Sequence, residues 1–190
     1  MGIIESLEQR RSVYALNKQL PVPEDQAVAA ITKAVELVPD AFNMHSQRVV
    51  IALGEKQDAL WDAVYDAFGG KVAREKLDGF KAAAGTVLYC IDTATVKSLQ
   101  EQYPRYAENF PIWAQQANGM LQISVWCALR DLGIGANIQH YNPVIDQALA
   151  SLFDVPASYQ LVAQMPFGGI AAPAGDKAAD DVNARVSIAR

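Results

Sequence analysis

The sequence has few of the residues that build metal centres and disulfide scaffolds: it contains two cysteines and two histidines among 190 residues. Cys90 and Cys127 lie in apolar stretches without the spacing of metal ligands. We therefore predict buried free thiols in a reducing compartment, and a disulfide or redox pair is the less favoured alternative. His45 and His140 are far apart in the chain, and no spacing of neighbouring carboxylates supports a metal site.

The motifs of several large enzyme classes are absent as well. There is no P-loop, no His-Glu-x-x-His, no Gly-x-Ser-x-Gly, and no Gly-x-Gly-x-x-Gly after the first expected strand. These absences argue against P-loop nucleotide hydrolases, zinc proteases of this type and α/β-hydrolases. They also disfavour a Rossmann dinucleotide site.

Positive charge and long apolar runs are scarce too. The net charge of −5 and the pI near 5.0 argue against a nucleic-acid-binding protein, which would present a basic face. No uncharged apolar run is long enough to span a bilayer. The first residues include Glu5 and lack the apolar core of a secretory signal. We therefore expect a cytoplasmic protein with no membrane or nucleic-acid partner.

Apolar side chains, by contrast, are abundant. They make up 51% of the residues, against 19% for charged ones. This is enough for one domain over 1–190 with a sizeable core, and it favours an additional surface to bury, such as a subunit interface. The segment 111–132 is expected to be a long helix with apolar residues on most sides. Such a helix is typical of a molecular centre or an interface.

The remaining periodicity predicts an α+β fold. We expect further helices over 2–11, 24–38, 55–68, 70–84 and 143–153, and strands over 48–53, 86–91, 159–165 and 182–188. The residues 166–169 are expected to end the third strand, because they contain proline and two glycines. The segment 94–110 is polar and contains aromatic residues, and it receives no assignment. The irregular order of helices and strands favours α+β over a doubly wound fold.

The triplet Arg10-Arg11-Ser12 follows the first expected helix. Two guanidinium groups and a hydroxyl can bind a phosphate through charge-assisted hydrogen bonds. Basic residues at the end of a helix are also common partners of the helix dipole. Taken alone, the triplet fits that structural role better than a ligand site.

Three other segments carry polar groups. The loop 39–48 places Asn43 and His45 before a strand. It could contact the edge of a flat heterocycle, or it could equally be an ordinary connection. The segment 133–143 leads from a glycine-containing turn into Gln139 and His140, whose backbone N–H groups would be free to point at a ligand. Arg185, in the expected last strand, could give a second contact to an anion.

In their order along the chain, these motifs resemble the FMN-dependent nitroreductase family. The shared features are Arg-Arg-Ser near the start, Pro-x-Ala-Phe-Asn before the first strand, Gly-x-Gly-x-x-x-Gln-His-Tyr-Asn-Pro after the long helix, Pro-Phe-Gly on a strand, and a final Arg-Val. The resemblance covers nearly the whole chain. It points to the small subgroup related to yeast fatty-acid-repression-type nitroreductases.

The resemblance implies a nitroreductase-like fold, with a central, mostly antiparallel sheet flanked by helices. It also implies an intertwined homodimer with FMN at each of two interface sites. Arg10 and Arg185 would hold the FMN phosphate, Ser12 would lie nearby, and Arg11 would contribute at the same end. Asn43 from the partner subunit would line the isoalloxazine ring.

The same resemblance places His45 of the partner subunit on the isoalloxazine, and the backbone N–H groups of Gln139 and His140 near flavin N5. Two positions depart from the family pattern. Tyr14 stands where many relatives have a basic side chain, and His45 stands where relatives commonly have glutamine. These changes concern the flavin ring and its potential, and they leave the phosphate contacts intact.

The implied activity is oxidation of NAD(P)H, with ping-pong hydride transfer through flavin N5 to a nitroaromatic, a quinone or a similar flat acceptor. Such chemistry resides in the flavin and needs no side-chain nucleophile, which agrees with the missing catalytic motifs. The alternative is a non-catalytic or regulatory flavoprotein in a lipid or stress response.

Overall fold

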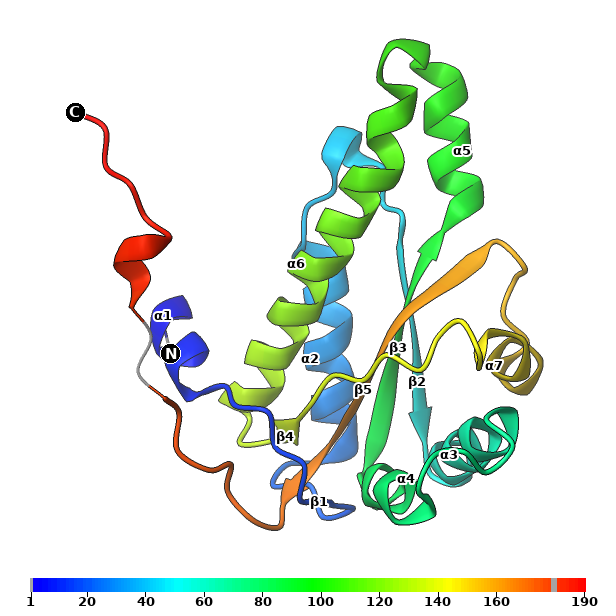
Figure 1. Cartoon of the computed structure of the whole chain (residues 1–190), viewed down its shortest axis with the longest axis vertical. Coiled ribbons are helices and arrows are strands. Elements are labelled where there is room, and N and C mark those ends of the chain that lie inside the picture. The colour runs from blue at the N-terminus through cyan, green and yellow to red at the C-terminus, as the bar shows by residue number, and fades with distance from the viewer. Residues whose placement is uncertain (1, 179–180) are drawn as a thin grey trace.

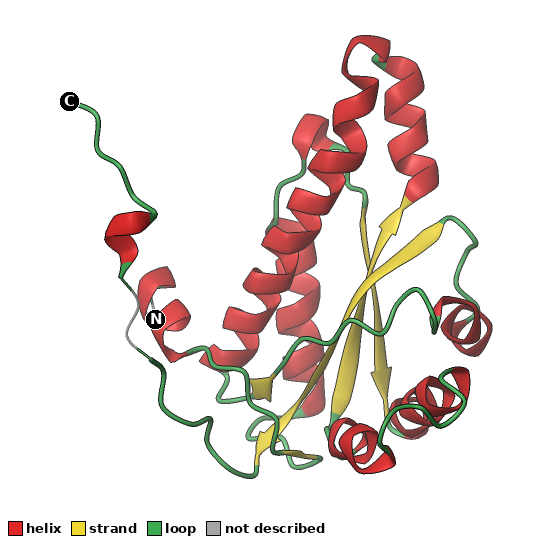
Figure 2. Cartoon of the chain, in the orientation of Figure 1, coloured by secondary structure: helices red, strands yellow, loops and turns green. Residues whose placement is uncertain are grey.

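The structure is a computed structural model that describes residues 2–178 and 181–190. Figure 1 shows the chain, and Figure 2 shows its helices and strands. The α-helices are α1 (Ile3–Gln9), α2 (Glu24–Leu37), α3 (Glu55–Ala67), α4 (Arg74–Lys81), α5 (Thr93–Gln102), α6 (Phe110–Asp131) and α7 (Asp146–Phe153). The strands are β1 (Leu16–Asn17), β2 (Gln47–Leu53), β3 (Gly85–Asp92), β4 (Gly135–Ala136) and β5 (Tyr159–Ile170), and short 3-10 helices are η1 (Ala41–Asn43), η2 (Pro104–Asn109) and η3 (Val182–Ala184).

The sheet is antiparallel, in the order β1-β5-β3-β2, and β4 also pairs with β5. Its central strand β3 is buried from Gly85 to Ile91, as its nearly continuous apolar sequence predicts. Successive side chains of a strand point to opposite faces. Tyr89 accordingly packs in the core with α2 and α6, and Leu88 packs in the core with α3, α4 and α7. The predicted α+β fold with a helix-flanked antiparallel sheet is therefore confirmed (Figure 1).

The strand β5 continues to Ile170, so the prediction that it ends at Pro166 is wrong. The carbonyl oxygen of Pro166 accepts a hydrogen bond from the Asn137 N–H at 3.2 Å, which keeps the proline in the sheet. A Cβ atom on Gly168 would clash with the Asn17 carbonyl oxygen. The glycines therefore allow β1 to approach closely, and they do not mark a turn.

The predicted last strand over 182–188 is also wrong. Val182–Ala184 forms the 3-10 helix η3, and the following residues have no regular structure. Val182, Val186 and Ile188 are exposed, and Figure 1 shows this C-terminal segment leaving the body of the chain. Alternating β-branched residues predict a strand only where a neighbouring strand is available to pair with them.

The structure corrects the predicted helix over 70–84, which is shorter than expected, and it assigns the segment 94–110. Helix α4 begins at Arg74, because Gly69 and Gly70 adopt positive φ angles of 57° and 75° and extend the turn after α3. The unassigned segment 94–110 is mostly helical, as α5 and η2. The carboxylate of Asp92 caps α5 by accepting a hydrogen bond from the Ala94 N–H.

Helix α6 lies against the sheet through residues such as Leu121 and Val125, but Ile112, Met120 and Ile123 on its other side are exposed. Ile3 and Ile4 of α1 are exposed as well, and α1 packs on α6. No helix of the described residues is long and apolar enough to cross a membrane. The uncovered apolar side chains are typical of a surface that another chain buries.

Candidate functional site

Arg10 lies directly after α1, where the chain crosses the end of α6. Its guanidinium carbon is 4.3 Å from the centre of the Trp126 ring, which is within the range of a cation–π contact. Its buried Nε atom has no hydrogen-bond partner among the described residues. A buried donor without a partner is costly, so this arginine is suited to an anionic ligand. No sequence signal indicated that Trp126 would hold the guanidinium.

Two hydrogen bonds fix α1, and hence Arg10, on α6. The Ser6 hydroxyl donates to the Asp131 carboxylate at 2.8 Å. The Arg130 Nε–H donates to the Gln9 carbonyl oxygen at 3.1 Å. Because these bonds attach the C-terminal half of α1 to α6, the backbone position of Arg10 is fixed relative to α6.

Arg11 and Ser12 continue from Arg10 into a segment that runs beside β4. Ser12 forms a parallel bridge with Ala136, and the Asn137 side chain donates to the Val13 carbonyl oxygen at 2.8 Å. The Arg11 guanidinium donates to the Gly175 carbonyl oxygen at 2.5 Å, and the Ser12 side chain is exposed. The structure therefore brings the predicted triplet alongside the segment that leads to Gln139.

Gln139 and His140 follow β4 and lie beside β5. The Gln139 N–H donates to the Gln164 carbonyl oxygen at 2.7 Å, and the Gln164 N–H donates in return at 2.9 Å. The Gln139 N–H is therefore used within the chain. His140 is exposed, and no hydrogen bond to its backbone N–H is found among the described residues. Of the two predicted backbone donors, His140 is thus the one available to a ligand.

A hollow of about 370 Å³ opens between Tyr14 and α4. Its lining includes Lys76 and Phe80, and the rings of Tyr14 and Phe80 are 6.5 Å apart. The Lys76 ammonium lies 5.7 Å from the Tyr141 ring centre. The sequence did not indicate these α4 residues, because a lysine and a phenylalanine on an amphipathic helix are the ordinary signs of a solvated face and a core face.

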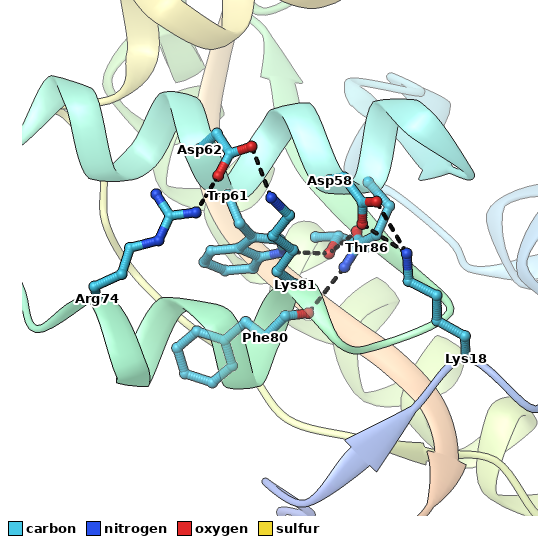
Figure 3. Close-up of polar contacts among 9 residues, drawn as sticks. Lys18, Asp58, Trp61, Asp62, Arg74, Phe80, Lys81 and Thr86 are labelled. Atoms are coloured by element: carbon cyan, nitrogen blue, oxygen red, sulfur yellow. Dashed lines mark hydrogen bonds and ion pairs between the residues drawn. The ribbon is translucent and has the colours of Figure 1, made fainter.

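A buried polar network holds α3 and α4 on the sheet (Figure 3). The Gln57 side chain donates to the Phe80 carbonyl oxygen at 2.9 Å, and the Thr86 hydroxyl donates to the Gln57 side-chain oxygen at 2.7 Å. The Trp61 indole N–H donates to the Thr86 hydroxyl at 3.1 Å. All three side chains are buried, so this satisfied network fixes the position of Phe80 in the hollow.

Ion pairs on the solvent side join the same two helices. The Asp62 carboxylate of α3 bonds to both Arg74 and Lys81 of α4 (Figure 3). The hydrogen bond from Lys81 is the main reason why the pKa of Asp62 is lowered. Asp58 also pairs with Lys18, at 2.8 Å, which links α3 to the segment after β1.

Asn43 and His45 lie at the opposite end of the sheet from Arg10. Their loop precedes β2, which pairs Gln47 with Ile91 at one end of β3 and Leu53 with Gly85 at the other. Strand β4 lies at the Gly85 end, since Phe167 pairs with both Gly85 and Ala136. Seven residues of strand span about 20 Å. One chain therefore does not bring the two predicted halves of the site together.

Arg185 lies at the end of η3, in the segment that extends away from the sheet (Figure 1). It is exposed, and its backbone N–H donates to the Val182 carbonyl oxygen at 2.9 Å.

The two cysteines are buried, as the sequence predicts. Cys90 and Cys127 are buried free thiols. Burial, together with the nearby Asp146 carboxylate, raises the pKa of Cys90 to about 12. Among residues 2–178 and 181–190, no group of three or more histidine, cysteine, aspartate or glutamate side chains could hold a metal ion.

Sequence comparison identifies the family of the chain. The sequence profile of the Nitroreductase family matches residues 7–169. The chain belongs to the nitroreductase family. It is 33% identical to the nitroreductase FRM2 of Saccharomyces cerevisiae over 168 residues, which cover 87% of this chain and 86% of that protein. It is also 33% identical to the yeast protein HBN1 over 177 residues, covering 92% and 91% of the two chains.

Solved nitroreductase structures extend this similarity to the whole chain. The nitroreductase CinD from Lactococcus lactis, solved with chloramphenicol, superimposes with a TM-score of 0.95 at 45% identity, and the match covers 100% of both chains. The same protein has been solved with 4-nitrophenol, with a TM-score of 0.94. A nitroreductase from Saccharomyces cerevisiae superimposes with a TM-score of 0.79 at 33% identity, covering 87% of this chain and 94% of that one. The chain is therefore a nitroreductase-type oxidoreductase by family and by fold.

Proposed function

We propose that this chain is an FMN-dependent NAD(P)H oxidoreductase that reduces nitroaromatics, quinones or similar flat acceptors. The observation that carries the proposal is Arg10, whose guanidinium is held against Trp126 with a buried Nε atom that has no partner. Support also comes from CinD, a relative of the same length that has been solved with the nitro compounds chloramphenicol and 4-nitrophenol and with nicotinic acid.

At the phosphate end, Arg10 would bind the FMN phosphate, with Arg185 as the second cation and the exposed Ser12 hydroxyl as a neutral donor. Guanidinium groups suit phosphate because their donors match its oxygen atoms in pairs. Arg11 would act at the same end. Its present contact with the Gly175 carbonyl oxygen ties it to the C-terminal segment, so its contribution would be smaller than that of Arg10.

At the ring end, the His140 backbone N–H would face the flavin N5 edge, and Gln139 would hold that turn through its paired bonds to Gln164. Tyr14 and Lys76 would lie beside the ring, because they line the hollow that continues from the Ser12 segment. Many relatives have a basic residue at the position of Tyr14. In this chain, Lys76 would supply that positive charge from α4 instead.

The proposed site is completed by a second copy of the chain. Asn43 and His45 lie a strand length away from Arg10 within one chain, so both sets can contact one flavin only if two subunits pair. Exposed apolar side chains on α1, α6 and the C-terminal segment, including Ile3, Ile112 and Val186, provide a surface for such a homodimer.

When bound, the flavin would supply the redox chemistry by accepting a hydride at N5 from the nicotinamide and passing it to the acceptor in a ping-pong sequence. The chain's own contribution is binding and orientation. The Arg10 guanidinium, held over the Trp126 ring, would orient the phosphate end, and the α3–α4 network would hold the wall that carries Phe80. No side chain is required to act as a nucleophile.

The proposal is tested by reconstituting the purified protein with FMN and titrating its fluorescence. We expect Arg10→Ala to weaken FMN binding by about 100-fold, since two charge-assisted hydrogen bonds contribute about 3 kcal/mol together. Lys33→Ala serves as a control, because it removes an exposed cation of α2 that lies outside the site. A wild-type protein that binds no FMN would contradict the proposal, and equal affinities of Arg10→Ala and wild type would show that the phosphate lies elsewhere.

A further inference from the structure

The loop that carries Asn43 and His45 has an unusual backbone. Phe42, Asn43 and His45 adopt positive φ angles of 56°, 53° and 50°. Residues with a Cβ atom rarely adopt this conformation, and for a bulky residue such as phenylalanine it is a marked outlier. Such a conformation persists only where the surrounding structure over-determines it. The contacts of the loop therefore show what enforces it.

An aromatic cluster of four rings contacts Phe42, whose side chain remains partly open to solvent, with 47% of the residue exposed. Its ring centre lies 5.0 Å from that of Tyr103 and 5.6 Å from that of Tyr106. It also lies 5.3 Å from Phe110, edge to face, and 5.6 Å from Trp113, stacked at 17°. These separations and angles are those of favourable aromatic pairs. Rings from the end of α5, from η2 and from α6 thus contact the side chain that precedes Asn43.

The alternate residues of the loop are anchored as well. Met44 is 5% exposed and packs in a core cluster with Phe110. The Asp40 carboxylate accepts hydrogen bonds from the backbone and the hydroxyl of Ser46, at 2.9 and 2.6 Å. Met44 and Ser46 are therefore buried, and Phe42 is held by its ring contacts although it is partly exposed. Asn43 and His45, which alternate with these positions, are exposed.

A partly buried ion pair holds the end of the loop. The Arg48 guanidinium donates to the His45 carbonyl oxygen at 2.6 Å and to the Asp92 carboxylate at 3.0 Å. Asp92 in turn caps α5. The His45 backbone is thus attached to the N-terminal end of α5, and Tyr103 of the aromatic cluster follows the C-terminal end of the same helix.

We propose that Phe42 is a positioning residue, which the aromatic cluster uses to present Asn43 and His45 in one fixed conformation to the flavin of the partner subunit. This inference rests on the proposed function. The strained backbone leaves two polar side chains exposed, one on each side of the buried Met44, and the anchored residues next to them prevent relaxation into an ordinary loop. A group that is already ordered loses less conformational entropy when it binds, so this arrangement favours FMN binding.

The first test uses the protein without added flavin. Hydrogen exchange, followed by mass spectrometry, should be faster over 40–46 in Phe42→Ala than in wild type, and unchanged in the sheet. Phe153→Ala, which truncates a half-buried phenylalanine of α7, should leave exchange over 40–46 unchanged. Unchanged exchange in Phe42→Ala would overturn the inference, whether or not the protein binds FMN.

The second test is a double-mutant cycle on FMN affinity, measured by fluorescence titration. Asn43→Gly removes the amide and tolerates the positive φ. We expect Phe42→Ala and Asn43→Gly each to weaken binding by about tenfold, and the double variant to weaken it by about the same factor, because both changes remove one interaction. Phe153→Ala should bind FMN as wild type does.

The outcomes separate this inference from the proposed function. A wild-type protein without FMN affinity overturns the proposed function, and the positioning role falls with it. If wild type binds FMN but Asn43→Gly binds it equally well, the assignment of Asn43 to the flavin is wrong. Suppose instead that Asn43→Gly weakens FMN binding. If Phe42→Ala then leaves the affinity unchanged, or if the double variant loses the product of the two single losses, only the positioning role is overturned.

Discussion

Replacing Thr86 with valine should destabilise the fold substantially, although the two side chains have nearly the same shape. In the native structure the Thr86 hydroxyl donates to the Gln57 side-chain oxygen at 2.7 Å and accepts from the Trp61 indole N–H at 3.1 Å. Thr86 and Gln57 are 0% exposed and Trp61 is 1% exposed, so water cannot replace the hydroxyl. The substitution leaves one buried acceptor and one buried donor unsatisfied, each at a cost of about 1–3 kcal/mol. The expected loss is about 2–6 kcal/mol in the free energy of unfolding.

Urea denaturation measures this loss directly. The Thr86→Val midpoint should fall without a change in the m-value, and Tm should fall by roughly 5–15 °C for a chain of this size. Thr32→Val is the matched control, because the Thr32 hydroxyl bonds to Val28 on the exposed side of α2, and it should change stability by less than about 0.5 kcal/mol. A loss below about 1 kcal/mol in Thr86→Val, or an equal loss in the control, would refute the assigned role of the network.

Two further predictions concern titratable groups. Burial raises the pKa of Asp92, but hydrogen bonds, including one from Thr95, and the charge of Arg48 outweigh it and lower the pKa. A lowered folded-state pKa contributes stability above the unfolded pKa, and this contribution is lost as the pH falls through the folded value. Asp92→Asn should therefore cost about 1–3 kcal/mol at pH 7 in urea denaturation, and this difference from wild type should shrink below about pH 4. Burial and the Asp146 carboxylate raise the pKa of the Cys90 thiol to about 12. This thiol should therefore resist alkylation by iodoacetamide in the native protein at pH 8 and react with it in urea, as measured by mass spectrometry. Rapid alkylation of the native protein would contradict its burial.

The sequence predicts the fold well where a pattern has one physical meaning. The apolar run of β3 is buried on both faces, as such runs usually are. The long helix α6 is apolar on most sides, as predicted. One of its sides packs on the sheet, and another carries exposed apolar residues. Strand β5 continues past Pro166 for a tertiary reason: the close approach of Asn17 requires Gly168, and a sequence read locally assigns the same glycine to a turn.

The candidate site is less predictable because its parts come from distant segments. In the sequence alone, Arg10 fits the role of a basic residue that ends a helix. Its contact with the Trp126 ring depends on the packing of α1 against α6. Lys76 carries no sequence signal for a site, since it lines the hollow only once the α3–α4 network is formed. The positive φ of Phe42 follows from contacts with Tyr103 and Trp113, which lie far along the chain.

We propose that this nitroreductase-family chain passes electrons from a nicotinamide to a flat acceptor through bound FMN. An anaerobic titration of the FMN-loaded protein with NADH and with NADPH tests it most directly. We predict that at least one nicotinamide bleaches the visible absorbance of the flavin, and that 4-nitrophenol or a quinone restores it. A loaded protein whose absorbance neither nicotinamide changes would contradict the claim, and would instead favour a flavin-binding protein with a regulatory role.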